Sequence, residues 1–135
     1  MDQPQPMTEE SVRNLLQDAG AKVMSRSGRS ENYGAPRDFS FEVRGVFVNG
    51  MTLHIVARQF NYRDPWEATG RVNDWVDVSL LRDGQYTPLP KGFAWFQQRD
   101  CEEQVDMAML AQMVTAIAGL NPKIYLLQKL TGDLP

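Results

Sequence analysis

One dipeptide constrains the fold of this chain more than any other feature. Asn49-Gly50 lies between two runs rich in β-branched and aromatic residues. Such a pair is the strongest short-range signal for a β-hairpin with a type I′ turn, in which both central residues have positive φ. The sequence therefore predicts an antiparallel hairpin that runs from Phe39 to Phe60.

Apolar and polar residues alternate in this hairpin, but the alternation shifts by one residue within the first strand. The apolar residues of 39–43 share one face, whereas Val46 and Val48 fall on the other. One extra residue in a strand restores the phase, so we expect a β-bulge at Gly45. The returning strand then adds Met51, Leu53, Ile55 and Ala57 to the apolar face. The predicted polar face carries Glu42, Arg44, Thr52, His54 and Arg58.

The segment before the hairpin predicts a helix and then a loop. Apolar residues spaced at i, i+3, i+4 and i+7 from Val12 indicate an amphipathic helix over 9–19. Thr8 is its expected N-cap and Gly20 its expected end. Residues 1–7 are expected to form a disordered leader, and the Ser- and Gly-rich stretch 25–36 a loop.

A second hairpin and two helices follow. Residues 75–80 alternate, Asp83-Gly84 forms a hairpin turn, and two prolines then keep the returning strand short. Residues 93–96 can form a further strand. Asp100, with Glu103 in a capping box, begins a long helix that Gly119 ends. The last helix begins at Asn121-Pro122 and ends at Gly132.

This order of elements predicts an α+β fold. We expect one domain over residues 8–135, with an antiparallel sheet of four to five strands in two hairpins. The N-terminal helix and the two C-terminal helices should pack mainly on one face of that sheet. The length of 135 residues fits a single domain.

Composition removes several classes of protein. No apolar run approaches the roughly 18 residues of a membrane span, so we expect no membrane association. Cys101 is the only cysteine, which excludes an intramolecular disulfide and favours the cytoplasm. His54 is the only histidine, which argues against most zinc sites and catalytic triads. We predict no metal, no cofactor and no catalytic residue.

Arginine and aromatic residues mark the candidate binding segment. Residues 20–71 hold eight of the 14 basic side chains against five acids. Interleaved arginine and aromatic side chains are typical of protein interfaces and of sites for single-stranded nucleic acid. The candidate binding residues are Arg26, Arg29, Arg44, His54, Arg58, Tyr62, Arg63, Trp66 and Arg71.

The leading hypothesis is a non-catalytic, cytoplasmic protein-binding module of the adaptor, chaperone or inhibitor type. In size, acidity and element order the chain resembles small dimeric chaperones and adaptors, a resemblance of architecture. Binding of nucleic acid or nucleotide through residues 26–71 and a small enzyme that uses His54 are the alternatives. The C-terminal helices carry more apolar surface than one stripe, which predicts a homodimer that forms through these helices or through the sheet edge. The expected self-association residues are Met107, Leu110, Val114 and Tyr125.

Overall fold

A computed structural model describes residues 7–30, 38–58 and 75–131 of the chain. Its elements in chain order are α1 (Glu9–Asp18), β1 (Lys22–Ser30), β2 (Asp38–Val46), β3 (Met51–Arg58), β4 (Val76–Arg82), β5 (Gln85–Tyr86), β6 (Cys101–Val105), α2 (Met107–Ala118) and α3 (Lys123–Thr131). All strand pairs are antiparallel. The predicted α+β class is therefore confirmed.

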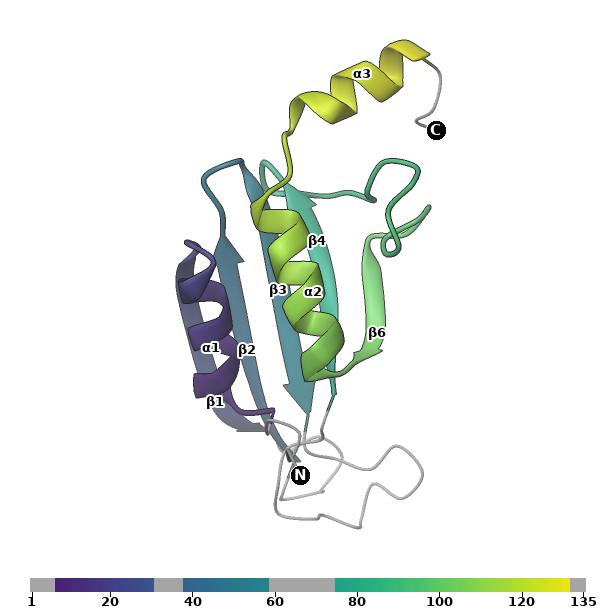
Figure 1. Cartoon of the computed structure of the whole chain (residues 1–135). Helices are drawn as coiled ribbons and strands as arrows, with labels where there is room; N and C mark the ends of the chain where they lie inside the picture. The colour runs from purple at the N-terminus through teal and green to yellow at the C-terminus, as the bar shows by residue number, and fades with distance from the viewer. Residues whose placement is uncertain (1–6, 31–37, 59–74, 132–135) are drawn as a thin grey trace, which may run out of the picture.

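The sheet is covered by helices on one face. Its strands follow the order β1-β2-β3-β4-β5, and β6 also pairs with β4. Figure 1 shows α1 and α2 side by side on one face, whereas α3 extends beyond the end of the sheet. Among the described residues, no helix is long and apolar enough to cross a membrane.

The first helix forms as its sequence predicts. The Thr8 hydroxyl accepts a hydrogen bond from the Ser11 amide at 3.0 Å, and the Ser11 hydroxyl accepts one from the Thr8 amide. Met7, which the prediction assigns to the leader, is buried. Met7 and Val12 occupy the two positions of a hydrophobic staple, one before the N-cap and four after it, and both belong to the buried core cluster. Gly20 follows the helix with a φ of +90°, a left-handed end that glycine adopts at little cost.

The predicted loop over 25–36 is wrong for its first half. Residues 25–30 belong to β1, which pairs with β2 without interruption from Lys22 opposite Val46 to Ser30 opposite Asp38. Serine and glycine lower the local preference for a strand, but pairing with a neighbouring strand can override that preference. Residues 31–36 lie outside the described residues.

The predicted β-bulge at Gly45 is also wrong. The register between β2 and β3 is regular from Phe41 opposite Ala57 to Val46 opposite Thr52. Gly45 therefore faces the helices, and Phe47 is buried in the core. The core does not contain Val46, which is half-buried on the opposite face, or the fully exposed Val48.

Gly45 is small because α1 packs directly above it. A Cβ atom at this position would lie 2.9 Å from Cδ2 of Leu16, closer than packed carbon atoms come. Leu16 is itself fully buried. The glycine thus lets α1 approach the sheet, which is a tertiary reason for a residue that sequence reasoning assigned to a bulge.

Only one of the two predicted hairpin turns has type I′ geometry. Of Asn49-Gly50, only Gly50 has a positive φ, and its amide donates to the Phe47 carbonyl at 3.1 Å. This is a turn over Val48-Asn49 followed by a left-handed glycine, not the predicted type I′ turn. The second turn does have the type I′ signature, since φ is 51° at Asp83 and 82° at Gly84.

The long helix begins later than its capping signal predicts. Residues 101–105 form β6, and the N-cap of α2 is Asp106, whose carboxylate accepts from the Met109 amide at 2.8 Å. The reason is tertiary: β5 pairs with only two residues of β4, and β6 fills the edge that remains. The predicted strand over 93–96 is absent, since these described residues form a bend within irregular structure.

Candidate functional site

The face of the sheet opposite α1 and α2 is the candidate site. We call it the open face, because no described helix covers it (Figure 1). Strand alternation assigns to it Lys22, Met24, Arg26, Glu42, Arg44, Val46, Thr52, His54, Val56, Asp77, Ser79 and Leu81. Thr52 and Leu81 are buried by their neighbours. The rest is a mixed surface on which opposite charges alternate with small apolar patches.

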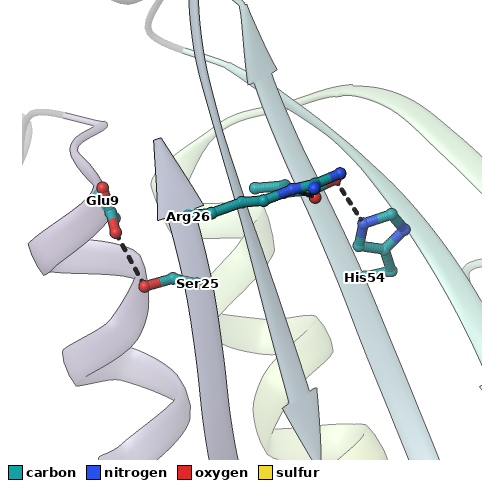
Figure 2. A network of polar contacts seen from close by, with 5 residues as sticks. Glu9, Ser25, Arg26 and His54 are labelled. Carbon is teal, nitrogen blue, oxygen red and sulfur yellow. Dashed lines mark hydrogen bonds and ion pairs between the residues drawn. The ribbon is translucent and has the colours of Figure 1, made fainter. Parts of the chain in front are cut away.

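A hydrogen-bonded cluster around Glu42 occupies this face. Arg26 from β1 donates through Nε to one carboxylate oxygen of Glu42 on β2. The other oxygen lies 3.2 Å from Nε2 of His54 on β3. A carboxylate only accepts, so the hydrogen of this bond is on the histidine nitrogen. Three neighbouring strands are thereby linked through one side chain (Figure 2).

Partial burial opposes ionisation of Glu42, but the hydrogen bonds favour it more strongly. Desolvation raises the pKa of this carboxyl, whereas the bonds and charges of His54 and Arg26 bring the pKa below its ordinary value. Glu42 is thus an anion that holds a cation and an imidazole in fixed positions. The cluster orients both groups toward the surface of the open face.

The residue next to Arg26 points the other way and fixes β1 to α1. The Ser25 hydroxyl donates to a Glu9 carboxylate oxygen at 2.8 Å and accepts from the Arg13 guanidinium. Figure 2 shows Ser25 directed toward the helix and Arg26 toward His54. β1 is therefore held from both faces of the sheet.

A row of side chains that includes His54 crosses the open face from β2 to β6. In register, Arg44 lies opposite His54, His54 opposite Ser79, and Ser79 opposite Cys101. Desolvation raises the pKa of the Cys101 thiol, a hydrogen bond with Ser79 partly opposes this, and nearby acids add to it. Cys101 begins β6, so it does not lie in the helix that was predicted to begin at Asp100. A thiol in this setting stays protonated at neutral pH.

The structure brings three of the predicted binding residues together. Arg26, Arg44 and His54 share the open face on adjacent strands. The chain trace places Arg29 in β1 and Arg58 in β3. The predicted residues Tyr62, Arg63, Trp66 and Arg71 lie outside the described residues.

Sequence reasoning placed Glu42 on the polar face but did not assign it to the site. The hairpin could have indicated this contact. Glu42 lies two residues before Arg44, and Arg44 pairs with His54, so Glu42 lies diagonal to His54. That register depends on whether Gly45 forms a bulge, so the contact could not be read from spacing alone.

The predicted self-association residues lie mainly inside the chain. Leu110, Val114 and Tyr125 are buried in the core, and Met107 is partly buried against it. Exposed apolar side chains lie on α3 instead: Leu126 is 59%, Leu127 61% and Leu130 75% exposed. The apolar side chains that the sequence predicted for a dimer interface are therefore partly in the core and partly exposed on α3.

In the described parts of the chain, no group of three or more His, Cys, Asp and Glu side chains is arranged to hold a metal ion. Comparison with known proteins assigns no function: no protein family, no curated protein and no solved structure matches the chain. The open face must therefore be interpreted from its own chemistry.

Proposed function

We propose that this chain is a non-catalytic, cytoplasmic protein-binding module of the adaptor, chaperone or inhibitor type, and that it docks its partner on the open face of the sheet. One observation carries the proposal. The helices α1 and α2 pack on one face of the sheet, and the other face presents a preset arrangement of charged groups, with Arg26 and His54 held by Glu42. Side chains ordered before binding lose less entropy on association.

The composition of the open face supports a protein partner over a nucleic acid. The cations Lys22, Arg26 and Arg44 are interspersed with the acids Glu42 and Asp77. Affinity for a phosphate backbone comes from many uncompensated cations. Mixed charges beside exposed apolar groups such as Met24 are instead what a protein interface presents.

The arrangement around His54 supports binding over catalysis. The contact with Glu42 orients the imidazole, as a catalytic base requires, but Arg26 shares the same carboxylate. No described hydrogen bond joins His54 to the nearby hydroxyls of Thr52 or Ser79. The contact between nucleophile and base that defines a catalytic pair is thus not formed here.

A charge reversal on the open face tests the proposal. Tagged protein is used to capture partners from an extract of the native cells, and the captured proteins are identified by mass spectrometry. Arg44 is exposed and forms no described ion pair, so Arg44→Glu changes the surface without breaking the Glu42 cluster. We expect the variant to lose a protein that the unmodified chain retains, by about tenfold or more if Arg44 is central to the interface.

Lys123→Glu is the matched control, because it reverses the same charge at an exposed position of α3, away from the open face. This variant should retain the partner. Equal retention by both variants, or equal loss, would contradict docking on the open face. Recovery of nucleic acid in place of protein, with a steep dependence on salt, would favour the nucleic-acid alternative.

A further inference from the structure

β1 forms one edge of the sheet, and no described strand pairs with its outer side. It comes first in the strand order, and Figure 1 shows it as the outermost strand on one side of the sheet. Its nine residues pair with β2 along their whole length, so the edge is long and regular. The described hydrogen bonds include none to its outer backbone groups. An edge of this kind is complementary to one more extended strand.

The two faces of β1 offer different environments to such a strand. On the helix face, Val23 packs against the core and Ser25 is bonded to α1. On the open face, Lys22 is exposed, Met24 is 54% exposed and the Arg26 side chain 83% exposed. Discrimination between strands must therefore come from the open face, where the order is cation, apolar group, cation.

We propose that the outer edge of β1 binds an extended acidic segment of another protein as an additional strand, with the pattern acid-x-apolar-x-acid on the open face. The inference rests on the proposed protein-binding function and names the chemistry of the partner. In such a pair, each acid of the added strand lies opposite a cation, Lys22 or Arg26. The apolar residue lies opposite Met24 and packs against it. Because the pattern is symmetric, it suits a parallel or an antiparallel strand.

The charge of β1 disfavours a second copy of the same strand. β1 contains Lys22, Arg26 and Arg29 and no acidic residue. Pairing β1 with itself brings like charges together, which destabilises the pair. Glu42 neutralises Arg26 in part, but no described acid forms an ion pair with Lys22. Lys22 is therefore the residue that most favours an acidic strand over β1 itself.

Peptide binding to the full chain tests the proposal. The probe is a fluorescein-labelled peptide, Thr-Thr-Glu-Thr-Leu-Thr-Glu-Thr-Thr, and its control carries lysine in place of both glutamates. Fluorescence anisotropy measures the dissociation constants. We expect the acidic peptide to bind at least about tenfold more tightly, since opposite charges replace like charges at two positions. Amide exchange in β1 should slow on binding.

Two modifications separate strand addition from simple charge attraction. The amide groups of alternate residues in an added strand point toward β1, and the others point away. N-methylation of the peptide amides that point toward β1 should abolish binding. Methylation of the amides that point away should preserve it. Lys22→Glu should weaken the acidic peptide by about fivefold, and Lys123→Glu, the same charge change on α3, should not.

Several outcomes would overturn the inference. Equal binding of the acidic and basic peptides would remove the charge argument, and equal tolerance of both methylated sets would remove strand addition. A dimer that Lys22→Glu alters would show that the edge is filled by a second copy. If no peptide binds while Arg44→Glu still releases a captured protein, the edge proposal fails and docking on the open face stands.

Discussion

Gly45 allows α1 to approach the sheet, and a side chain there has no space. We predict that Gly45→Val lowers the free energy of unfolding by about 1–3 kcal/mol, because even its Cβ would meet Leu16 at 2.9 Å. Urea denaturation measures the change. The double variant Leu16→Ala, Gly45→Val should recover part of the loss relative to the sum of the two single variants. An unchanged midpoint for Gly45→Val would show that α1 does not pack at this distance.

Glu42 makes stability depend on pH in the acid range. Its pKa is lowered in the folded state by His54 and Arg26, which outweigh desolvation. The stabilisation is therefore complete above the ordinary pKa of about 4.3 and is lost as the pH falls through the lower, folded value. We expect the unmodified chain to lose up to about 1 kcal/mol more than Glu42→Gln between pH 7 and pH 3.

Thermal or urea unfolding at several pH values checks this expectation. Glu103→Gln, at an exposed carboxyl of β6, removes a charge without touching the cluster and should follow the pH dependence of the unmodified chain. Parallel curves for Glu42→Gln and the unmodified chain would mean that the cluster does not hold Glu42 in its ionised form.

Asn49 joins two elements that are far apart in the sequence. Its side-chain amide donates to the carbonyls of Ile117 and Leu120 at 2.8 and 2.9 Å, and its oxygen accepts from the Met51 amide. The β2–β3 turn thereby caps the C-terminal end of α2. We predict that Asn49→Ala costs about 1–3 kcal/mol of stability, measured by urea denaturation.

Asn49→Asp distinguishes the contribution of the α2 cap from that of the hydrogen bond within the turn. An aspartate can still accept from Met51 but cannot donate to α2, and its charge is repelled by the negative end of that helix. It should therefore destabilise the fold at least as much as alanine at pH 7. A neutral effect would show that Asn49 serves the turn alone.

Tyr125 fixes α3 to the rest of the chain through several contacts. Tyr125 is buried, its hydroxyl donates to the Pro88 carbonyl at 3.0 Å, and the Arg82 guanidinium carbon lies 4.1 Å from its ring centroid. We predict that Tyr125→Ala removes hydrogen-exchange protection from α3 and leaves α2 protected. Lys129→Ala, at an exposed position of α3 outside its apolar patch, should change neither.

The whole molecule is predicted to self-associate through the exposed apolar side chains of α3. Leu126, Leu127 and Leu130 lie within two turns and are more than half exposed, and closed twofold pairing is the common way to bury such a patch. Light scattering should give a mass that rises with concentration above the 15.3 kDa of one chain. Leu127→Gln with Leu130→Gln should abolish that rise. A constant mass for the unmodified chain would contradict the prediction.

Features that depend on a few neighbouring residues could be read from the sequence. The capping of α1 by Thr8, the second turn at Asp83-Gly84 and the end of α2 at Gly119 all occur where predicted. The prediction also placed Arg44 and His54 on the same polar face of the hairpin, where the structure pairs them. In each case the physical cause lies within one helical turn or one strand pair.

The tertiary structure decided everything that needed a distant partner. Residues 25–30 form a strand because they pair with β2. Residues 101–105 form a strand because they pair with the free edge of β4. Gly45 is explained only by Leu16, which lies in another element. The contact of Glu42 with His54 followed from the same regular register. Local preferences differ by about 1 kcal/mol or less per residue, so a strand pair or a packed helix can reverse them.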